Sequence, residues 1–499
     1  MPGHAPSPDA AFVEPAAGRS FDVLIVGAGL SGIGAAHHLQ RACPGTSYAI
    51  LEARDTLGGT WDLFRYPGIR SDSEMYTLGY GFKPWRGRKA IADGPEILRY
   101  LRETADEAGI TPNVRFGHRV VGASWSSADA RWTLTVRGPD GRDTPWRAQF
   151  VLLCAGYYSY AQGHRPSFDG EADFRGRIVH AQFWPEDLDY AGRRVVVIGS
   201  GATAVTLVPA MARTAHVTML QRSPTYVVNR PAEDRLALAL GRVLPARLAY
   251  RIARVRNVAR MMFYYRIAKR RPEMFAQRIV ELARAQLPAG FDMRHFTPSY
   301  KPWDQRLCVV PDGDLFRAIG EGRADVVTDT IERFTADGVR LASGRELPAD
   351  LIVLATGLKL NVLGDVEFQV DGRRFDASTA MTYKGMMLSD LPNCVMTFGY
   401  TNSSWTLRAD LVADFACRLI GHMRRRGLAV VTAPRDPTVE VSPFLALSSG
   451  YVQRGAPLLP KQGTRDPWRV TQNYVADLAA LRFASLDDGV LRFAREAAA

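Results

Sequence analysis

The chain contains little cysteine, and none of it is paired in the sequence. The five cysteines among 499 residues stand singly at positions 43, 154, 308, 394 and 417, and no C-x-x-C pair occurs. This excludes disulfide-rich scaffolds, dithiol reductases and zinc ribbons. The spacing of His, Cys and carboxylate residues offers no metal site either. Free thiols are typical of a reducing compartment, so we expect a cytoplasmic protein.

Long apolar runs are also missing. No stretch of eighteen apolar residues is free of charge, which excludes a membrane-spanning helix. Residues 1–20 contain Pro, Asp and Glu where a signal peptide needs an apolar run, so we expect a disordered tail and no secretion. Apolar residues still make up 46% of the chain and charged residues 23%. This composition is globular, and 499 residues suffice for two or three packed domains.

Acidic residues are outnumbered by basic ones, 51 against 63, and the net charge of +12 favours anionic ligands. Residues 235–284 hold thirteen of the arginines and lysines, interleaved with apolar residues at helical spacing. Two interpretations of this segment stay open: a helical insertion with a solvated basic face, or helices that contact a membrane surface and make the protein membrane-associated. We find no nucleic-acid-binding motif and expect no nucleic-acid partner.

Residues 21–52 have the pattern of a strand, a glycine-rich turn, a helix and a second strand. In this pattern Gly27 makes the tight turn, Gly29 lets the backbone approach a pyrophosphate, and Gly32 lets the helix pack on the strand. Glu52 ends the second strand, where a carboxylate accepts hydrogen bonds from an adenosine ribose and repels a 2′-phosphate. The pattern therefore predicts a site for FAD or NAD.

A second unit of the same kind begins at VVVIGSGATAV. Gly199, Gly201 and Ala204 occupy its three turn positions, and alanine is an accepted variant at the third. Its second strand ends at Arg222 and Ser223, which offer paired donors to a 2′-phosphate. This unit is therefore predicted to bind NADPH, and the two sites together imply a flavin that NADPH reduces.

These units predict an α/β protein with two Rossmann-like dinucleotide-binding domains, one for FAD and one for NADPH, and a helical insertion. The expected boundaries are 21–185 and 376–499 for the FAD-binding domain, 186–230 and 301–375 for the NADPH-binding domain, and 231–300 for the insertion.

Two longer motifs indicate the reaction. FRGRIVHAQFWP fits F-x-G-x-x-x-H-x-x-x-W-P, with Phe174, Gly176, His180, Trp184 and Pro185 at the fixed positions, and GGTWDLFRYPGIRSD precedes it. On these motifs the chain resembles the type I Baeyer–Villiger monooxygenases, which are class B flavoprotein monooxygenases. Stretches such as HAQFWPEDLDYAG, TMLQRSPTY and GYTNSSWTL are similar to the ethionamide-activating group.

The resemblance implies an NADPH- and O2-dependent enzyme whose flavin forms a C4a-peroxide. Such an enzyme inserts one oxygen into ketones, giving esters or lactones, and also oxygenates sulfides or thiocarbonyls. It implies that Arg306 supplies the positive charge at the reacting oxygen and that Asp72 orients Arg306. Gln305 departs from the family, many members of which have a lysine there for the 2′-phosphate, so NADPH preference would rest on Arg222 and Ser223.

The resemblance also assigns cofactor residues, position by position. Those for FAD are Gly27, Gly29, Ser31, Gly32, Glu52, Thr60, Trp61, Asp62, Leu63, Asp72 and Val120. Those for NADPH are Arg70, Ser71, Asp72, Gly199, Ser200, Gly201, Ala202, Thr203, Ala204, Val205, Arg222 and Ser223. We interpret His180 as part of a linker that controls domain movement, with proton transfer as the alternative. Trp405 faces either the reacting groups or the core.

Two other functions stay open. The first is an N- or S-oxygenating flavin-containing monooxygenase without Baeyer–Villiger activity, although that family usually has Phe or Tyr at the position of Trp184. The second is a flavoprotein redox sensor that docks on a membrane through residues 235–284. The expected substrates are O2 and a small ketone or sulfur compound.

Overall fold

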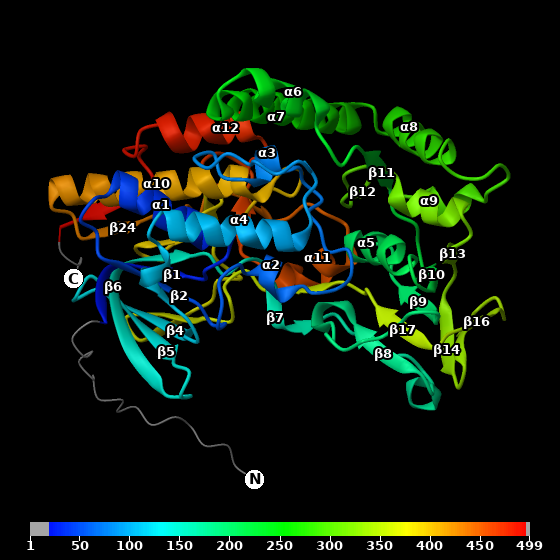
Figure 1. The fold of residues 1–499 in the computed structure, drawn as a ribbon. Coiled ribbons are helices and arrows are strands. Elements are labelled where there is room, and N and C mark those ends of the chain that lie inside the picture. The colour runs from blue at the N-terminus through cyan, green and yellow to red at the C-terminus, as the bar shows by residue number, and fades with distance from the viewer. Residues whose placement is uncertain (1–18, 496–499) are drawn as a thin grey trace, which may run out of the picture.

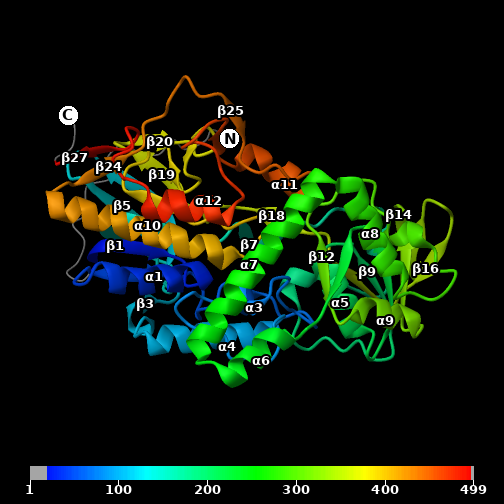
Figure 2. The same ribbon diagram turned by 90° about the horizontal axis from the view of Figure 1, so that it is seen from above.

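The computed structural model describes residues 19–495, so the tail predicted for residues 1–20 falls almost entirely outside the described residues. The chain folds into two α/β domains and a group of helices that lies across both (Figure 1). Seen from above, the longest of these helices runs diagonally from one domain to the other (Figure 2). The predicted fold class, two Rossmann-like domains with a helical insertion, is confirmed.

The first domain is built on a nine-stranded sheet that three helices cover on one face. Its strands are β1 (Ser20–Val26), β2 (Tyr48–Leu51), β3 (Val114–Arg115), β4 (Arg119–Ser126), β5 (Arg131–Arg137), β6 (Asp143–Leu153), β19 (Glu367–Val370), β20 (Arg373–Phe375) and β23 (Cys394–Met396). Their order is β20-β19-β4-β5-β6-β1-β2-β3, with β23 beside β6. The helices are α1 (Leu30–Ala42), α4 (Gly94–Glu107) and α10 (Trp405–Arg426).

Successive residues of β1 point to opposite faces of this sheet. Val23 and Ile25 pack with the three helices, whereas Leu24 and Val26 join the core on the other face. A strand that is buried on both faces explains the unbroken apolar run in the sequence. The pairing of β1 also fixes the position of the turn that follows, because β1 runs parallel to β2 and β6 and ends beside them.

The turn after β1 requires its glycines. Gly27 has a φ of +101°, and a Cβ there would lie 2.7 Å from the Cys154 carbonyl oxygen. A Cβ at Gly32 would lie 1.9 Å from the Gly27 carbonyl oxygen, so only glycine lets α1 start this close to the strand.

The second domain has a five-stranded parallel sheet in the order β13-β10-β9-β17-β8, where the strands are β8 (Arg177–His180), β9 (Arg194–Ile198), β10 (His216–Gln221), β13 (Ala324–Thr328) and β17 (Leu351–Leu354). Helices α5 (Ala202–Met211) and α9 (Asp314–Gly320) pack on it. Gly199 follows β9 with a φ of +144°, and a Cβ there would lie 2.4 Å from the Ala355 carbonyl oxygen.

Two of the predicted domain boundaries, at 185 and 375, differ from the membership of the sheets. Strand β8 pairs in parallel with β17 and so belongs to the second sheet, although its residues fall in the predicted range 21–185. Strands β19 and β20 extend the first sheet through β4, although they fall in the predicted range 301–375. In both cases the pairing partner is distant in the sequence, so local patterns do not show which sheet the strand joins.

The insertion consists of α6 (Arg235–Val243), α7 (Ala246–Arg270) and α8 (Pro272–Arg284), as the helical spacing predicts. Helix α7 carries eight basic residues and no acidic one in 25 residues. Within residues 19–495, no helix is both long and apolar enough to cross a membrane.

Shorter elements connect these units and line the space between them. The helices are α2 (Thr60–Leu63), α3 (Met75–Leu78), α11 (Gly450–Gly455) and α12 (Tyr474–Leu478). Small sheets pair β7 (Tyr158–Gly163) with β18 (Leu358–Leu360), β11 (Val227–Arg230) with β12 (Cys308–Pro311), β21 (Thr382–Tyr383) with β22 (Met387–Leu388), β24 (Val430–Thr432) with β27 (Arg492–Ala494), and β25 (Val441–Pro443) with β26 (Lys461–Gly463). The strands β14 (Ile331–Thr335), β15 (Gly338–Leu341) and β16 (Glu346–Pro348) form a three-stranded sheet.

Candidate active site

A cavity of about 890 Å³ lies where the two domains and the insertion meet. This volume is near the upper end of the usual range for ligand pockets, roughly 300 to 1,000 Å³. Residues from both predicted nucleotide units line it. The predicted site residues among them are Gly27, Gly29, Ser31, Glu52, Thr60, Trp61, Arg70, Ser71, Asp72, Val120, Ala202 and Arg306.

Glu52 is held at the wall of this cavity by backbone hydrogen bonds. Its carboxylate accepts the N–H groups of Ala28 at 2.7 Å and Arg54 at 2.9 Å. Burial raises the pKa of Glu52, and the two backbone hydrogen bonds oppose that rise. Each carboxylate oxygen keeps a further lone pair, so Glu52 is able to accept ribose hydroxyl groups as well.

The glycine turn after β1 faces a second glycine turn across a narrow gap. A Cβ at Gly59 would lie 3.0 Å from the Gly29 Cα and 3.1 Å from the Tyr160 hydroxyl. Helix α1 begins at this gap with no side-chain cap, so its N-terminal N–H groups are not covered by a side chain. Bare backbone, a helix N-terminus and the Glu52 carboxylate together fit the adenosine diphosphate part of FAD.

Three of the residues predicted for FAD lie outside the cavity wall. The carboxylate of Asp62 is fully buried, where it pairs with Arg54 and, at 3.2 Å, with Arg65. Leu63 continues α2, and Gly32 packs on the Gly27 carbonyl. The side chain of Asp62 therefore supports the turn on the side away from the cavity.

Arg306 places a positive charge inside the cavity. Its Nη1 lies 3.7 Å from Asp72 Oδ2, and its Nη2 donates to the Tyr400 carbonyl oxygen at 3.3 Å. Burial lowers the pKa of the Arg306 guanidinium, but neighbouring tyrosines and Asp72 raise it more, so the net pKa lies above its ordinary value. The side chains of Arg306 and Asp72 remain 34% and 42% exposed, so both are accessible from the cavity.

The two residues before Asp72 are already engaged by the protein. Arg70 Nη1 lies 2.5 Å from Asp314 Oδ2, which ties the first domain to α9 of the second. The Ser71 hydroxyl donates to the Ser73 carbonyl at 2.7 Å and accepts the Ser73 N–H at 2.9 Å. Asp72, the third residue predicted near the reacting end of NADPH, faces Arg306 with its Oδ2 and accepts from the Ser73 hydroxyl with its Oδ1 at 3.4 Å.

The second glycine turn lies at the side of the cavity rather than in its wall. Of the predicted residues, Ala202 lines the cavity, whereas Gly199, Ser200, Gly201, Thr203, Ala204, Val205, Arg222 and Ser223 do not. The Ser200 hydroxyl donates to the Ser223 carbonyl at 3.0 Å, which joins the turn to the end of β10. A Cβ at Gly201 would meet no atom within 4 Å, so this turn is open to a ligand.

Arg454 on α11 is a cation near this turn that the sequence does not reveal. Burial lowers the pKa of Arg454, and the charge of Arg222 lowers it further. Arg454 also approaches the end of β17, because a Cβ at Gly357 would lie 3.9 Å from its Nη2. Within residues 19–495 neither arginine forms an ion pair with a carboxylate, so two positive charges flank the turn without a counterion.

Aromatic residues form part of the cavity wall between the two turns. Trp405 donates from Nε1 to the Ser31 hydroxyl at 2.8 Å and stacks on Tyr157 with ring centroids 5.1 Å apart. Trp405 lines the cavity and also packs against the core, and its place beside the reacting groups stays a prediction. Tyr157 has no motif around it in the sequence and was not predicted.

His180 lies at the end of β8, away from the cavity wall. Its Nδ1 accepts the Gln182 N–H at 3.2 Å, and Nε2 lies 3.3 Å from the His164 carbonyl oxygen. Burial lowers the pKa of His180. The ring therefore connects two segments that link the domains, and its role in domain movement stays a prediction.

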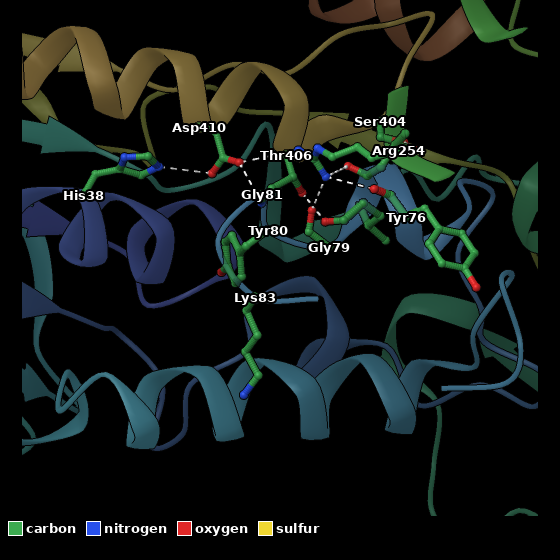
Figure 3. Close-up of polar contacts among 12 residues, drawn as sticks. His38, Tyr76, Gly79, Tyr80, Gly81, Lys83, Arg254, Ser404, Thr406 and Asp410 are labelled. Carbon is green, nitrogen blue, oxygen red and sulfur yellow. Dashed lines mark hydrogen bonds and ion pairs between the residues drawn. The ribbon is translucent and has the colours of Figure 1, made fainter. Parts of the chain in front are cut away.

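The insertion is fixed to the first domain by Arg254 of α7 (Figure 3). Its guanidinium donates to the carbonyl oxygens of Gly79 at 2.7 Å and Tyr76 at 3.0 Å, and lies 3.5 Å from Asp410. Asp410 in turn accepts from His38 of α1 at 3.4 Å. This network anchors α7 to both α1 and α10.

Comparisons with known proteins show the family of the chain. The family of flavin-binding monooxygenase-like proteins matches residues 91–270, and the NAD(P)-binding Rossmann-like domain matches residues 25–103. The FAD-containing monooxygenase EthA of Mycobacterium tuberculosis is 54% identical over 481 residues, which cover 96% of this chain and 98% of EthA.

Solved structures share the fold at lower sequence identity. Oxidized steroid monooxygenase bound to NADP has a TM-score of 0.75 at 22% identity, covering 95% of this chain and 100% of that one. Cyclohexanone monooxygenase with bound ε-caprolactone has a TM-score of 0.72 at 20% identity, covering 95% and 99%.

These findings confirm the resemblance that the motifs indicate. The relative EthA is named an FAD-containing monooxygenase, and the solved structure of OTEMO, at 22% identity, holds FAD and NADP together. The chain therefore belongs to the family of FAD-containing flavin monooxygenases, with the two-domain fold of the Baeyer–Villiger monooxygenases.

Proposed function

We propose that the chain is an NADPH- and O2-dependent monooxygenase that inserts one oxygen atom into ketones, giving esters or lactones, and also oxygenates sulfides or thiocarbonyls. The observation that carries this proposal is Arg306, a cation that cannot release its proton, placed in the same cavity as the FAD cradle. The lactone bound to cyclohexanone monooxygenase supports it, because ε-caprolactone is cyclohexanone with one oxygen added.

The proposed FAD residues act by shape and charge. Gly29 and Gly59 let two backbones approach the pyrophosphate, and the N-terminus of α1 attracts its negative charge. Glu52 would hold the adenosine ribose. When bound and reduced by NADPH, FAD supplies the activation of O2.

Arg306 would stabilise the negative charge that develops on oxygen during the reaction. A preorganised cation in a site that excludes water has a stronger effect on such a charge than water has. Asp72 limits the positions of the guanidinium from one side and the Tyr400 carbonyl limits them from another. We therefore assign charge stabilisation to Arg306 and positioning to Asp72.

The proposed NADPH residues bind phosphates. The open turn from Gly199 to Val205 and the uncapped start of α5 would hold the pyrophosphate. Arg222, with Ser223, would bind the 2′-phosphate, and Arg454 takes the position of a second cation beside the turn. These cations would supply the positive charge for the 2′-phosphate that a lysine often supplies in the family at the position of Gln305.

The experiment is oxygenation under ¹⁸O2. The FAD-loaded protein is supplied with NADPH and a ketone, and the product is analysed by mass spectrometry. An ester or lactone with one ¹⁸O atom is expected. If a sulfide is oxygenated while every ketone is untouched, the chain is an S-oxygenating enzyme without Baeyer–Villiger activity. NADPH oxidation without any oxygenated product would favour the redox-sensor alternative.

We also infer that the outer face of α6–α8 contacts an anionic membrane surface. Of the fourteen large apolar side chains exposed in the described part of the chain, nine lie on these helices. Seven of them do not line the cavity: Leu236, Val243, Leu248, Ile252, Val255, Phe263 and Met274; Tyr264 and Leu282 also line it. Those on α7 share that helix with eight basic residues, and apolar side chains with neighbouring cations suit an anionic lipid surface. We expect the protein to sediment with vesicles that contain phosphatidylglycerol but not with phosphatidylcholine vesicles. Failure to sediment with either kind of vesicle would refute the inference.

A further inference from the structure

Two of the arginines that line the cavity differ from the rest. Within residues 19–495, seven arginines line it, and five of these have a carboxylate within 4.0 Å: Arg54 with Asp62, Arg70 with Asp314, Arg119 with Asp365, Arg278 with Glu281, and Arg306 with Asp72. The remaining two, Arg230 and Arg260, form no ion pair and no side-chain hydrogen bond in the described part of the chain.

The acidic group nearest to this pair is already occupied. Glu74 accepts the Thr77 N–H at 3.2 Å and the Thr77 hydroxyl at 2.5 Å. Burial raises the pKa of Glu74 to about 7, so near neutral pH it carries only part of a negative charge. Glu74 therefore neutralises Arg230 and Arg260 only in part.

The backbone of both arginines has a fixed position. Arg230 is the last residue of β11, which pairs with β12 along its length. Arg260 lies on α7, whose position Arg254 fixes through the contacts seen in Figure 3. Burial lowers the pKa of Arg230, and the charge of Arg260 lowers it further. Arg230 is half-buried and Arg260 is exposed, and both line the cavity without a carboxylate within 4.0 Å, so they present positive charge to an anion that enters it.

The wall beside this pair is apolar. Met261 and Tyr264 of α7, together with Ile279 and Leu282 of α8, line the same cavity. A ligand that reaches Arg230 and Arg260 along this wall must therefore bury an apolar chain and present an anion at its end.

We propose that Arg230 and Arg260 form a subsite for a carboxylate, and that it selects ketone substrates in which an apolar chain ends in a carboxylate. This inference rests on the proposed oxygenation of ketones in the same cavity. The phosphates of NADP are the competing source of an anion, but the open turn and the cations Arg222 and Arg454 lie at the second domain's sheet edge.

The test compares 10-oxoundecanoic acid, a methyl ketone with a terminal carboxylate, with its methyl ester. Binding to the FAD-loaded protein is measured by titration calorimetry, and oxygenation by product analysis with NADPH. The wild type should bind the acid at least roughly tenfold more tightly than the ester, because a charged hydrogen bond is worth roughly ten- to a hundredfold in affinity. Arg230→Gln and Arg260→Gln should each remove this preference and leave ester binding unchanged.

Arg266→Gln is the matched control, because Arg266 is an exposed cation on α7 that does not line the cavity. FAD content shows whether each variant folds, and the wild-type comparison of acid and ester stands without any variant. Equal affinity of the wild type for acid and ester would overturn the proposal, as would variants that raise the KM for NADPH instead.

The two proposals fail in different ways. If the acid binds with the expected preference but neither compound is oxygenated, the carboxylate subsite stands and the proposed function is wrong. If the ester is oxygenated and the acid is not preferred, the proposed function stands and the subsite is wrong.

Discussion

Replacement of Glu74 by glutamine removes a carboxylate that the folded protein must bury between arginines. Burial raises the pKa of Glu74 from its ordinary value of 4.5 to about 7, although Arg230, Arg260 and Arg254 oppose the rise. Protonation of this group therefore stabilises the folded state at low pH, and that stabilisation is lost as the pH rises from 4.5 to about 7. Glutamine keeps one of the two acceptors for Thr77 and has no proton to lose.

The size of the pKa shift of Glu74 determines how much stability the glutamine variant gains. A difference of about 2.5 pKa units corresponds to about 3 kcal/mol at 1.36 kcal/mol per unit. Glu74→Gln should thus be more stable than the wild type by up to about 3 kcal/mol at pH 8 and by under about 1 kcal/mol at pH 5. If about 480 residues unfold together, this is roughly 3 °C in Tm.

The assay is thermal unfolding of the FAD-loaded protein between pH 5 and pH 8.5. The exposed Glu273→Gln is the control, and its difference from the wild type should not change with pH. A Glu74→Gln variant whose Tm differs from the wild type by the same amount at every pH would show that Glu74 is ionised in the folded protein.

Two further predictions concern the cofactors. Arg222→Ala and Arg454→Ala should each raise the KM for NADPH roughly ten- to a hundredfold and that for NADH much less, because a charged hydrogen bond to the 2′-phosphate is lost; equal losses for both nucleotides would make these arginines structural. Gly59→Ala should lower FAD content, because its Cβ would lie 3.0 Å from Gly29 Cα, whereas Gly45→Ala, also at positive φ but with nothing within 4 Å, should retain FAD.

Much of the fold is predictable from the sequence because it is local. The turns at Gly27 and Gly199 each lie within a continuous strand-turn-helix pattern, and the structure contains both. Glu52 is predictable for the same reason, since it ends the strand next to the turn.

Contacts between distant segments are not predictable in this way. Arg454 of α11 comes close to Arg222 and to Gly357 after β17, and the pattern around it resembles that of any short helix. Arg230 and Arg260 look like ordinary members of a basic region, and only the structure shows that they lack the carboxylates that other cavity arginines have. The carboxylate of Asp62 turns away from the cavity because Arg54 and Arg65 hold it.

The measurement that most directly tests the account is the reaction of Arg306→Ala. FAD content, anaerobic reduction of the flavin by NADPH, and ester formation from a ketone are measured on one preparation. We expect FAD to remain bound and to be reduced, and ester formation to be lost, because we assign to Arg306 the stabilisation of the negative charge that develops on the reacting oxygen. A variant that still forms ester at close to the wild-type rate would contradict the assignment of Arg306 and the mechanism built on it.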